Sequence, residues 1–505
     1  KPKISSQQIK YIFFFTIISF PITLTMDAGY DAGLYHVAHQ KLIREEKIIF
    51  GLSNLHNVLG FSSFYEYLAA PTWVEGSLKN LPNIQIIFYI CFFLFLYERS
   101  KNYKNESLYI LLILITLPFW FRYASIKWGL VDFPFGIAFF LSVFYSFIIL
   151  HEKNFVNVKH FFSILIILNC LTFFLKPGGF VIGVLSSIII FFILNKKIFS
   201  LRELFKILTL PFIIVFLWII RGFINTSCFL YPFSFTCIDT NWGNAVDAEF
   251  NWQVTKEWGK IIFDLIQLNT NLSIIYILIG LIIITFLIIN LHNLIANKKK
   301  INFKYIYFLI FFVFVLQLIL FNKSVDFSRD QISFSKILTE INYSIFVFGF
   351  FYLILVLFFS LYKFKKNSID LKYTPFLFSI FVFIAWMISS PIPRLGFSFI
   401  GSIFLTFLCL LKKENFENIN QKKIINFSLF LICIISLNYS FFSDYKLKKF
   451  HSSNLSIPEI KTISRNGFGV KPVDGDQCWD VIWCSPLEPY EIRMIEINKY
   501  KFLLK

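Results

Sequence analysis

The chain has 505 residues, of which 57% are hydrophobic and only 15% are charged, and its mean hydropathy is +0.67. Because ordinary soluble domains are about one-quarter charged, this composition excludes a soluble enzyme of this length. A net charge of +18 would suggest nucleic acid as the partner of a soluble protein. Here much of the lysine and arginine lies in short tracts between apolar runs, which is typical of membrane orientation, and we expect no nucleic-acid partner.

Apolar runs recur along the chain, and they are long enough to cross the hydrocarbon core of a bilayer, which is about 30 Å thick. Because backbone polar groups must be paired inside lipid, each run is predicted to be a helix. The expected fold is an all-α integral membrane protein with about thirteen transmembrane helices. The predicted spans lie near residues 11–26, 84–97, 108–121, 131–150, 161–175, 179–194, 207–223, 273–291, 304–321, 341–362, 374–390, 395–411 and 424–442. The first run lacks a small-residue cleavage pattern, so we expect it to be retained.

The distribution of lysine and arginine predicts the orientation of these helices. If the N-terminus is cytoplasmic, the N-terminal segment and the internal loops together hold 24 of the 48 Lys and Arg residues in a small part of the chain. We therefore expect a transmembrane domain over residues 1–442, with external loops at 27–83, 224–272 and 322–340. A small external segment over residues 443–505 is expected to follow it.

Four of the eight cysteines form two close pairs, Cys228 with Cys237 and Cys478 with Cys484. Both pairs lie on the side that the charge distribution makes external, which is oxidising in a bacterium. Two short disulfide-closed loops are therefore expected, and the alternative is four free thiols.

The densest polar cluster follows the first apolar run, where Asp27 and Asp31 lie four residues apart. Carboxylates are costly next to lipid, so they need a reason to be there. One interpretation is a general base, with or without a divalent cation (Mg²⁺ or Mn²⁺) bound by the two carboxylates, and Asp31 is the favoured base. The alternative is that Asp31 caps the next helix. That helix is predicted over residues 34–50 as an amphipathic helix on the outer leaflet.

Positively charged side chains near the external helix ends form a second group of candidates. Arg394, Arg221 and Lys176 lie where a lipid phosphate would bind, and arginine suits bidentate contacts with phosphate. The alternative is that they extend toward lipid headgroups and bind no particular ligand.

Four further polar residues are candidates for contact with an acceptor or substrate: His36, Asn54, His56 and Asp132. The two histidines accompany the acidic loop, although a single histidine is more often a hydrogen-bonded structural residue, and their spacing matches no zinc site. Asp132 begins the predicted span near 131–150, where it is expected either to contact the acceptor or to pair with a cation.

Several stretches together resemble a known family. Residues 31–36 (Asp-Ala-Gly-Leu-Tyr-His), followed by residues 51–61, resemble the opening of a family of uncharacterised bacterial multi-pass membrane proteins that is similar to the GT-C glycosyltransferases. Further similar stretches follow in the expected order, at 125–126, 132–134, 221, 230–232, 239–242, 391–396, 475–480 and 484–486.

The resemblance implies a GT-C-like fold and a glycosyltransferase, expected to be inverting, in the bacterial inner membrane. The enzyme would move a sugar from a polyprenyl-phosphate-linked donor to a surface glycan, lipid or protein acceptor on the external face. Asp31, or Asp27, would be the base, and Arg394 and Arg221 would hold the donor phosphate. An O-antigen-type polymerase and a transporter or flippase of lipid-linked sugars are the alternatives, and ionisable residues in mid-helix would favour transport.

Overall fold

In a computed structural model of the chain, the described residues are 31–73, 131–253 and 374–389, with single gaps, together with short stretches near 6–17, 84–95, 398–406 and 460–504. Helices account for most of these residues. Several predictions lie outside the described residues, namely Asp27, Arg394, the 322–340 loop, the boundary after residue 442 and the spans near 108–121, 273–291, 304–321, 341–362 and 424–442.

Four of the described helical segments are long and apolar enough to cross a membrane. They are α7 (Asp132–His151), α8 (Phe155–Leu175), the 3₁₀ turn η5 (Pro177–Val181) continued by α9 (Ile182–Asn195), and α10 (Leu201–Thr226). Each contains one of the spans predicted between residues 131 and 223, except that α7 begins one residue after the predicted start at 131, so these four predictions are confirmed. A shorter apolar helix, α15 (Thr374–Ser389), occupies the span predicted near 374–390.

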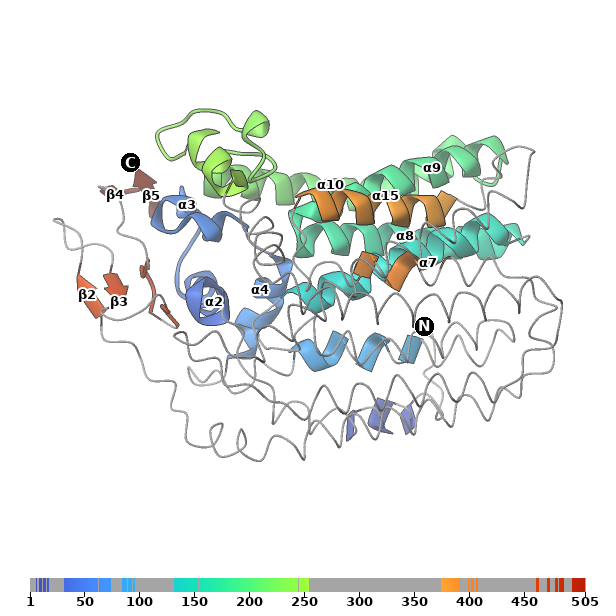
Figure 1. Cartoon of the computed structure of the whole chain (residues 1–505), viewed down its shortest axis with the longest axis horizontal. Helices are drawn as coiled ribbons and strands as arrows, with labels where there is room; N and C mark the ends of the chain where they lie inside the picture. Colours follow the sequence, from blue (N-terminus) through green and yellow to red (C-terminus); the bar gives the residue numbers. More distant parts are fainter. Residues whose placement is uncertain are drawn as a thin grey trace, which may run out of the picture.

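Short connections at residues 152–154 and 196–200 join α7 to α8 and α9 to α10, and helices that follow one another in the chain run antiparallel. Consequently α7 begins, and α8 and α10 end, at the same end of the helical part, which we call the polar end (Figure 1). At the opposite end, Lys159 of α8 pairs with Glu203 of α10 across 2.7 Å. The Ser200 side chain accepts from the Glu203 amide there, and this capping box begins α10.

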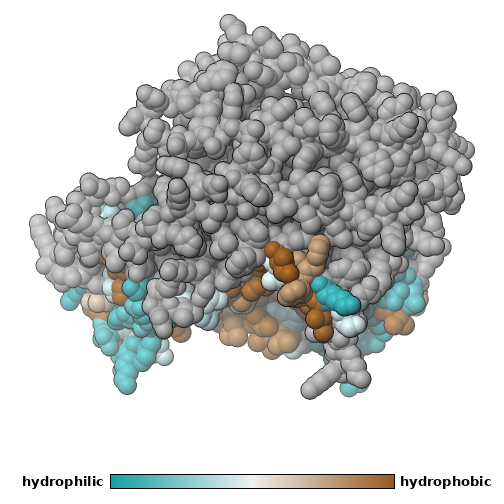
Figure 2. All heavy atoms as spheres, turned by 90° about the horizontal axis from the view of Figure 1, so that it is seen from below, coloured by the Kyte–Doolittle hydropathy of each residue, from teal (hydrophilic) through white to brown (hydrophobic). Residues whose placement is uncertain are grey.

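The helices differ in how much protein surrounds them. The most apolar part of α7 is 94% buried, because α8, α9 and α15 pack around it, whereas the corresponding part of α10 is 0% buried. Phe139 of α7 illustrates the packing, with its ring stacked at 6.3 Å between centroids on Phe378 of α15. Among the described atoms in Figure 2, hydrophobic ones gather in the middle and hydrophilic ones at both sides, as expected for a membrane protein.

Short helical segments from residues 31–73 cover the polar end and contact α8 and α10. They are the π-helical turn η1 (Ala32–His36), α2 (Val37–Glu45), α3 (Leu52–Leu55), the 3₁₀ turn η2 (Asn57–Phe61), α4 (Phe64–Ala69) and the 3₁₀ turn η3 (Ala70–Thr72). The helix predicted over 34–50 therefore ends at Glu45, and α2 packs against α4 and η3 with five buried residues. Its apolar face is covered by protein because α4 and η3 fold back over it.

The all-α prediction needs a correction at the C-terminal segment, which contains strands. The strand β5 (Tyr500–Leu504) pairs with β4 (Arg493–Ile497) in antiparallel fashion and with β1 (Ile49–Phe50) in parallel. A separate antiparallel pair joins β2 (Ile460–Thr462) to β3 (Val470–Pro472). These strands are only two to five residues long, so they are too short to show a clear alternating pattern beside the long apolar runs.

Candidate functional site

The turn that carries Asp31 lies at the polar end, immediately before η1. The Asp31 side chain makes no capping bond to the helix, and the residue is only 9% exposed. The capping alternative therefore gains no support, and the carboxylate lies almost entirely inside the protein. The turn that follows is a π-helix, a rare conformation that is often found at functional sites.

The C-terminal segment contacts this turn directly. The backbone amides of Cys478 and Trp479 both donate to the Gly33 carbonyl, at 2.7 and 2.8 Å. Cys478 is joined to Cys484 with an S–S distance of 2.12 Å, as the sequence predicts. Residues more than 440 positions apart in the chain thus form one wall of the candidate site.

A buried carboxylate lies between two histidines just behind the turn. His36 Nδ1 is 2.7 Å from Glu66 Oε1, and His39 Nδ1 is 2.5 Å from Glu66 Oε2, with all three side chains at most 4% exposed. Burial alone would raise the pKa of the Glu66 carboxyl, but His39 and His36 together hold that pKa well below its usual range. The Glu66 carboxylate therefore stays ionised although it is buried.

Glu66 also helps to cap the N-terminus of its own helix, α4, and the sequence analysis did not identify it as a candidate. Its Oε2 accepts from the Ser63 amide, and the Ser63 hydroxyl accepts from within the first turn of α4, which together form a capping box. Two local signals were available, since Ser63 and Glu66 have the spacing of a capping box and His36 and His39 share a helix face. Only the fold shows that Glu66 meets the helix face that carries the two histidines.

Asn54 and His56, both predicted to contact an acceptor or substrate, occupy the interior of the polar end. The Asn54 amide donates to the carbonyls of Trp242 and Leu503, at 3.0 and 2.7 Å, so it ties three distant segments together. His56 is 6% exposed, and burial lowers its pKa from 6.5 to about 4. Its ring centroid lies 6.5 Å from that of Tyr35, the neighbour of His36.

The structure pairs Asp132 with Lys176, a contact that joins the start of α7 to the end of α8. Asp132 thus has the cation partner that was one of its two predicted roles. Because the carboxylate neutralises the Lys176 ammonium, a phosphate at this position would have to share that cation with Asp132.

Arg221, near the end of α10, lies between two aromatic rings. Its guanidinium carbon is 4.4 Å from the ring centroid of Tyr67 and 4.6 Å from that of Trp218, and its Nε donates to the Tyr67 hydroxyl. Burial raises the pKa of the Tyr67 hydroxyl, although Arg221 opposes the rise. The two rings and the hydroxyl thus hold the Arg221 guanidinium at the polar end.

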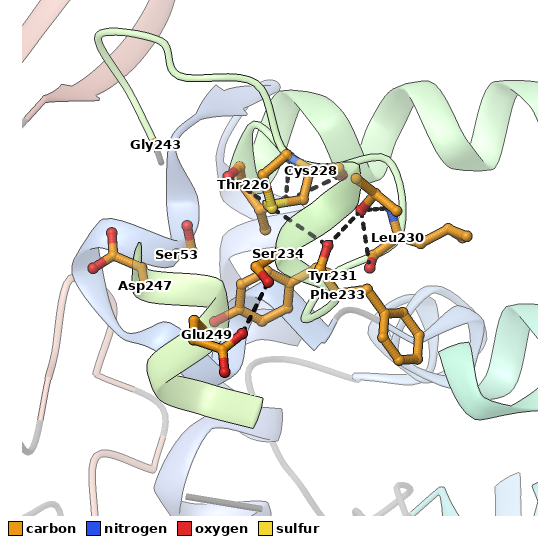
Figure 3. The surroundings of a disulfide bond; sticks show 12 residues. Ser53, Thr226, Cys228, Leu230, Tyr231, Phe233, Ser234, Gly243, Asp247 and Glu249 are labelled. Atoms are coloured by element: carbon orange, nitrogen blue, oxygen red, sulfur yellow. Dashed lines mark hydrogen bonds between the residues drawn. A yellow bond between two sulfur atoms is a disulfide. The ribbon is translucent and has the colours of Figure 1, made fainter. Parts of the chain in front are cut away.

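The loop after α10 closes this side of the site (Figure 3). Cys228 and Cys237 lie at disulfide distance, 2.02 Å, in agreement with the predicted pair. The Tyr231 hydroxyl donates to the Asn57 carbonyl at 3.1 Å, and burial followed by the nearby Asp247 raises the pKa of that hydroxyl. Figure 3 also shows the hydrogen bond that the Ser234 hydroxyl donates to the Glu249 carboxylate, which lies on the helical segment after the loop; its length is 2.9 Å.

Within the part of the chain that the structure describes, no group of three or more His, Cys, Asp or Glu side chains is arranged to hold a metal ion. Asp27 lies outside the described residues. A divalent cation bound by Asp27 and Asp31 therefore stays a prediction.

Comparison with known proteins places the chain in a family. The model of a domain of unknown function, DUF8201, matches residues 1–324, which include the Asp31 turn, the Glu66 cluster and helices α7 to α10. Among curated proteins and solved structures, nothing matches the chain. Since the matched region covers more than half of the sequence, the protein belongs to the DUF8201 family.

Proposed function

We propose that this protein is a membrane glycosyltransferase of GT-C type, which moves a sugar from a polyprenyl-phosphate-linked donor to a surface glycan, lipid or protein acceptor. One observation carries the proposal: a nearly buried acid, Asp31, lies at the polar end of membrane-crossing helices, where Arg221 and Lys176 also lie. A reaction between a membrane-embedded phosphate donor and a polar acceptor needs a carboxylate as base and cations for the phosphate at such an interface.

In this proposal Asp31 is the general base. It takes the proton of the acceptor hydroxyl while the oxygen of that hydroxyl bonds to the anomeric carbon of the sugar. The bond from that carbon to the phosphate oxygen breaks, and the electron pair leaves with the polyprenyl phosphate. Arg221 and Arg394 neutralise the departing phosphate, since guanidinium groups match its oxygens in pairs. A single displacement of this kind inverts the anomeric configuration.

Replacement of Asp31 tests the role of the base. Asp31→Asn keeps the size and polarity of the side chain but removes the proton acceptor, so sugar transfer should fall by roughly 10²–10⁴. The measurement is the amount of surface glycan that each variant restores to a deletion strain at matched membrane expression. Asp239→Asn, at an exposed position of the same end, is the control and should restore the glycan fully. Full restoration by both Asp31→Asn and Asp27→Asn would overturn the proposal.

The location of ionisable groups supports an enzyme more than a transporter. In the four described membrane helices, these groups lie near the helix ends, as Asp132 and Arg221 do, whereas transport pathways place them in mid-membrane. A flippase would instead make Asp31→Asn harmless and would leave lipid-linked sugar on the inner leaflet in the deletion strain. An O-antigen-type polymerase would leave single lipid-linked repeat units there.

We further propose that the polar end faces the outside of the bacterial inner membrane and that the N-terminus is cytoplasmic. Both cysteine pairs at disulfide distance belong to the polar end, and Lys196 and Lys197 lie at the opposite end. A reporter fused after Lys505 tests this: alkaline phosphatase should be active there and green fluorescent protein dark. The opposite pattern would show that the polar end faces the cytoplasm and that the proposed orientation is wrong.

A further inference from the structure

The π-helical turn after Asp31 has an identifiable cause in its hydrogen bonds. In an α-helix the Val37 amide would donate to the carbonyl four residues earlier, at Gly33. Here it donates to Ala32, five residues earlier. The Gly33 carbonyl is already occupied, because it accepts from the amides of Cys478 and Trp479. The C-terminal loop therefore takes the acceptor that an α-helical turn would use.

This contact depends on the missing side chain of Gly33. A Cβ atom at this position would collide with the end of the Gln477 side chain and would lie 2.7 Å from the Trp479 ring. The Gln477 side chain can move aside, but Trp479 is constrained by its own bond to Gly33 and by a backbone φ of 48°, which few residues other than glycine adopt. The Cys478–Cys484 disulfide closes the loop behind these residues.

The residues after the turn are held from the other side. His36 and His39 contact Glu66, and the Trp73 ring nitrogen donates to the Gln40 side chain at 3.0 Å. Because α2 is anchored in this way, a change from a π-turn to an α-turn would move the residues that precede the turn, and α2 would stay in place. One residue corresponds to about 100° of rotation around the helix axis, so Asp31 would point elsewhere.

We propose that the Cys478–Cys484 loop is a positioning element for Asp31, with Gly33 and Trp479 as its positioning residues. By taking the Gly33 carbonyl, the loop imposes the π-turn and so sets the direction of the Asp31 carboxylate. The catalytic meaning of this inference rests on the proposed function, whereas the hydrogen-bond arrangement does not.

The test compares two glycine substitutions in the purified full-length protein. Gly33→Ala should separate the loop from the turn, whereas Gly183→Ala, where a Cβ would meet nothing within 4 Å, is the matched control. Hydrogen exchange of the Cys478 and Trp479 amides should become about tenfold or more faster in Gly33→Ala, because both lose their acceptor. Gly183→Ala should not change it.

Two further measurements separate positioning from general damage. Surface glycan in cells should fall about tenfold or more in Gly33→Ala, while binding of a sugar-free polyprenyl phosphate to the purified protein should change less than about twofold. The double substitution Cys478→Ala with Cys484→Ala opens the loop without adding atoms at Gly33 and should give the same pattern. If Gly33→Ala fails to fold, this double cysteine variant still tests whether the loop positions Asp31. Adding Trp479→Gly to Gly33→Ala, which removes the ring and suits the positive φ, should restore part of the glycan.

The outcomes distinguish this inference from the proposed function. If Asp31→Asn abolishes the glycan but the loop variants keep it despite faster exchange, the positioning role is wrong and the proposed function stands. A parallel loss of polyprenyl-phosphate binding and glycan in the loop variants would also overturn positioning, since it would show a purely structural role. If both Asp31→Asn and Asp27→Asn keep the glycan, the proposed function is wrong, and the exchange data still report whether the loop holds the Gly33 carbonyl.

Discussion

The helical part and the polar end of this protein are held together by contacts of different range. In the helical part, α7 packs mainly against α8, its neighbour in the chain, and the turns between helices are short. At the polar end the partners come from opposite ends of the sequence. Lys501 pairs with Glu46 at 2.6 Å, and the Asn54 amide donates to the Leu503 carbonyl. The membrane helices can therefore assemble locally, whereas the candidate site forms only when the C-terminal segment returns to residues 31–73.

The same local motif shows this difference directly, because each region has a capping box among its described helices. Ser63 and Glu66 begin α4 at the polar end, and Ser200 and Glu203 begin α10 at the other end. Glu66 is 1% exposed and contacts two histidines, whereas Glu203 is exposed and pairs with Lys159. Identical capping chemistry thus has very different surroundings.

Removing each glutamate should give the largest expected difference between the two regions. Glu66→Ala leaves His36 and His39 buried without their carboxylate, so the free energy of unfolding should fall by about 3–5 kcal/mol. Glu203→Ala removes an exposed cap and a solvent-screened ion pair, so its effect should be much smaller. Chemical denaturation of the purified protein measures both. Equal losses would show that burial of the cluster adds nothing beyond capping.

The Cys228–Cys237 disulfide at the polar end should contribute less to the free energy of unfolding than the Glu66 cluster. Cys228 and Cys237 are nine residues apart, and the chain-entropy model gives about 2–3 kcal/mol for a loop of this length. Cys228→Ala with Cys237→Ala should lower the free energy of unfolding by that amount, and Cys170→Ala in α8, a free cysteine, is the control. Alkylation of both loop cysteines without reductant would contradict the prediction.

Protonation of His56 should give the smallest of these effects. Its pKa is 6.5 when unfolded and about 4 when buried, so above pH 6.5 neither state is charged and His56 has no effect. As the pH falls below 6.5, the unfolded chain binds a proton that the folded protein does not, and stability decreases by about 2 kcal/mol by pH 5. His56→Gln should remove this decrease between pH 7.5 and pH 5.

The Glu66 carboxyl does not obscure that measurement. Its pKa is lowered by folding, so its contribution to stability is fully present above its ordinary value of 4.5 and is lost only as the pH falls further. The melting temperatures of the wild-type protein and of His56→Gln are compared between pH 7.5 and pH 5. If both change by the same amount, His56 is hydrated in solution.

Particular residues show how far the sequence could predict this arrangement. The four spans between residues 131 and 226 followed from apolar runs, and the two cysteine pairs followed from their proximity in the chain. Glu66 was missed because the spacing from Ser63 signals a cap and says nothing about histidines 27 or more residues earlier. The pairing of β5 with β1 was missed because two short strands leave no periodic signal that dominates the apolar background.

The sequence by itself determined which segments are apolar enough to enter a membrane, because transfer into lipid depends on the summed hydropathy of a local window. It also determined which cysteines are near enough to close short loops. Only the tertiary structure decided that α7 is surrounded by protein while α10 is not, since equally apolar helices differ only in what packs against them. It alone decided that the Gly33 carbonyl is taken by Cys478 and Trp479, because a hydrogen bond between residues so far apart in the chain depends on the path of the whole backbone.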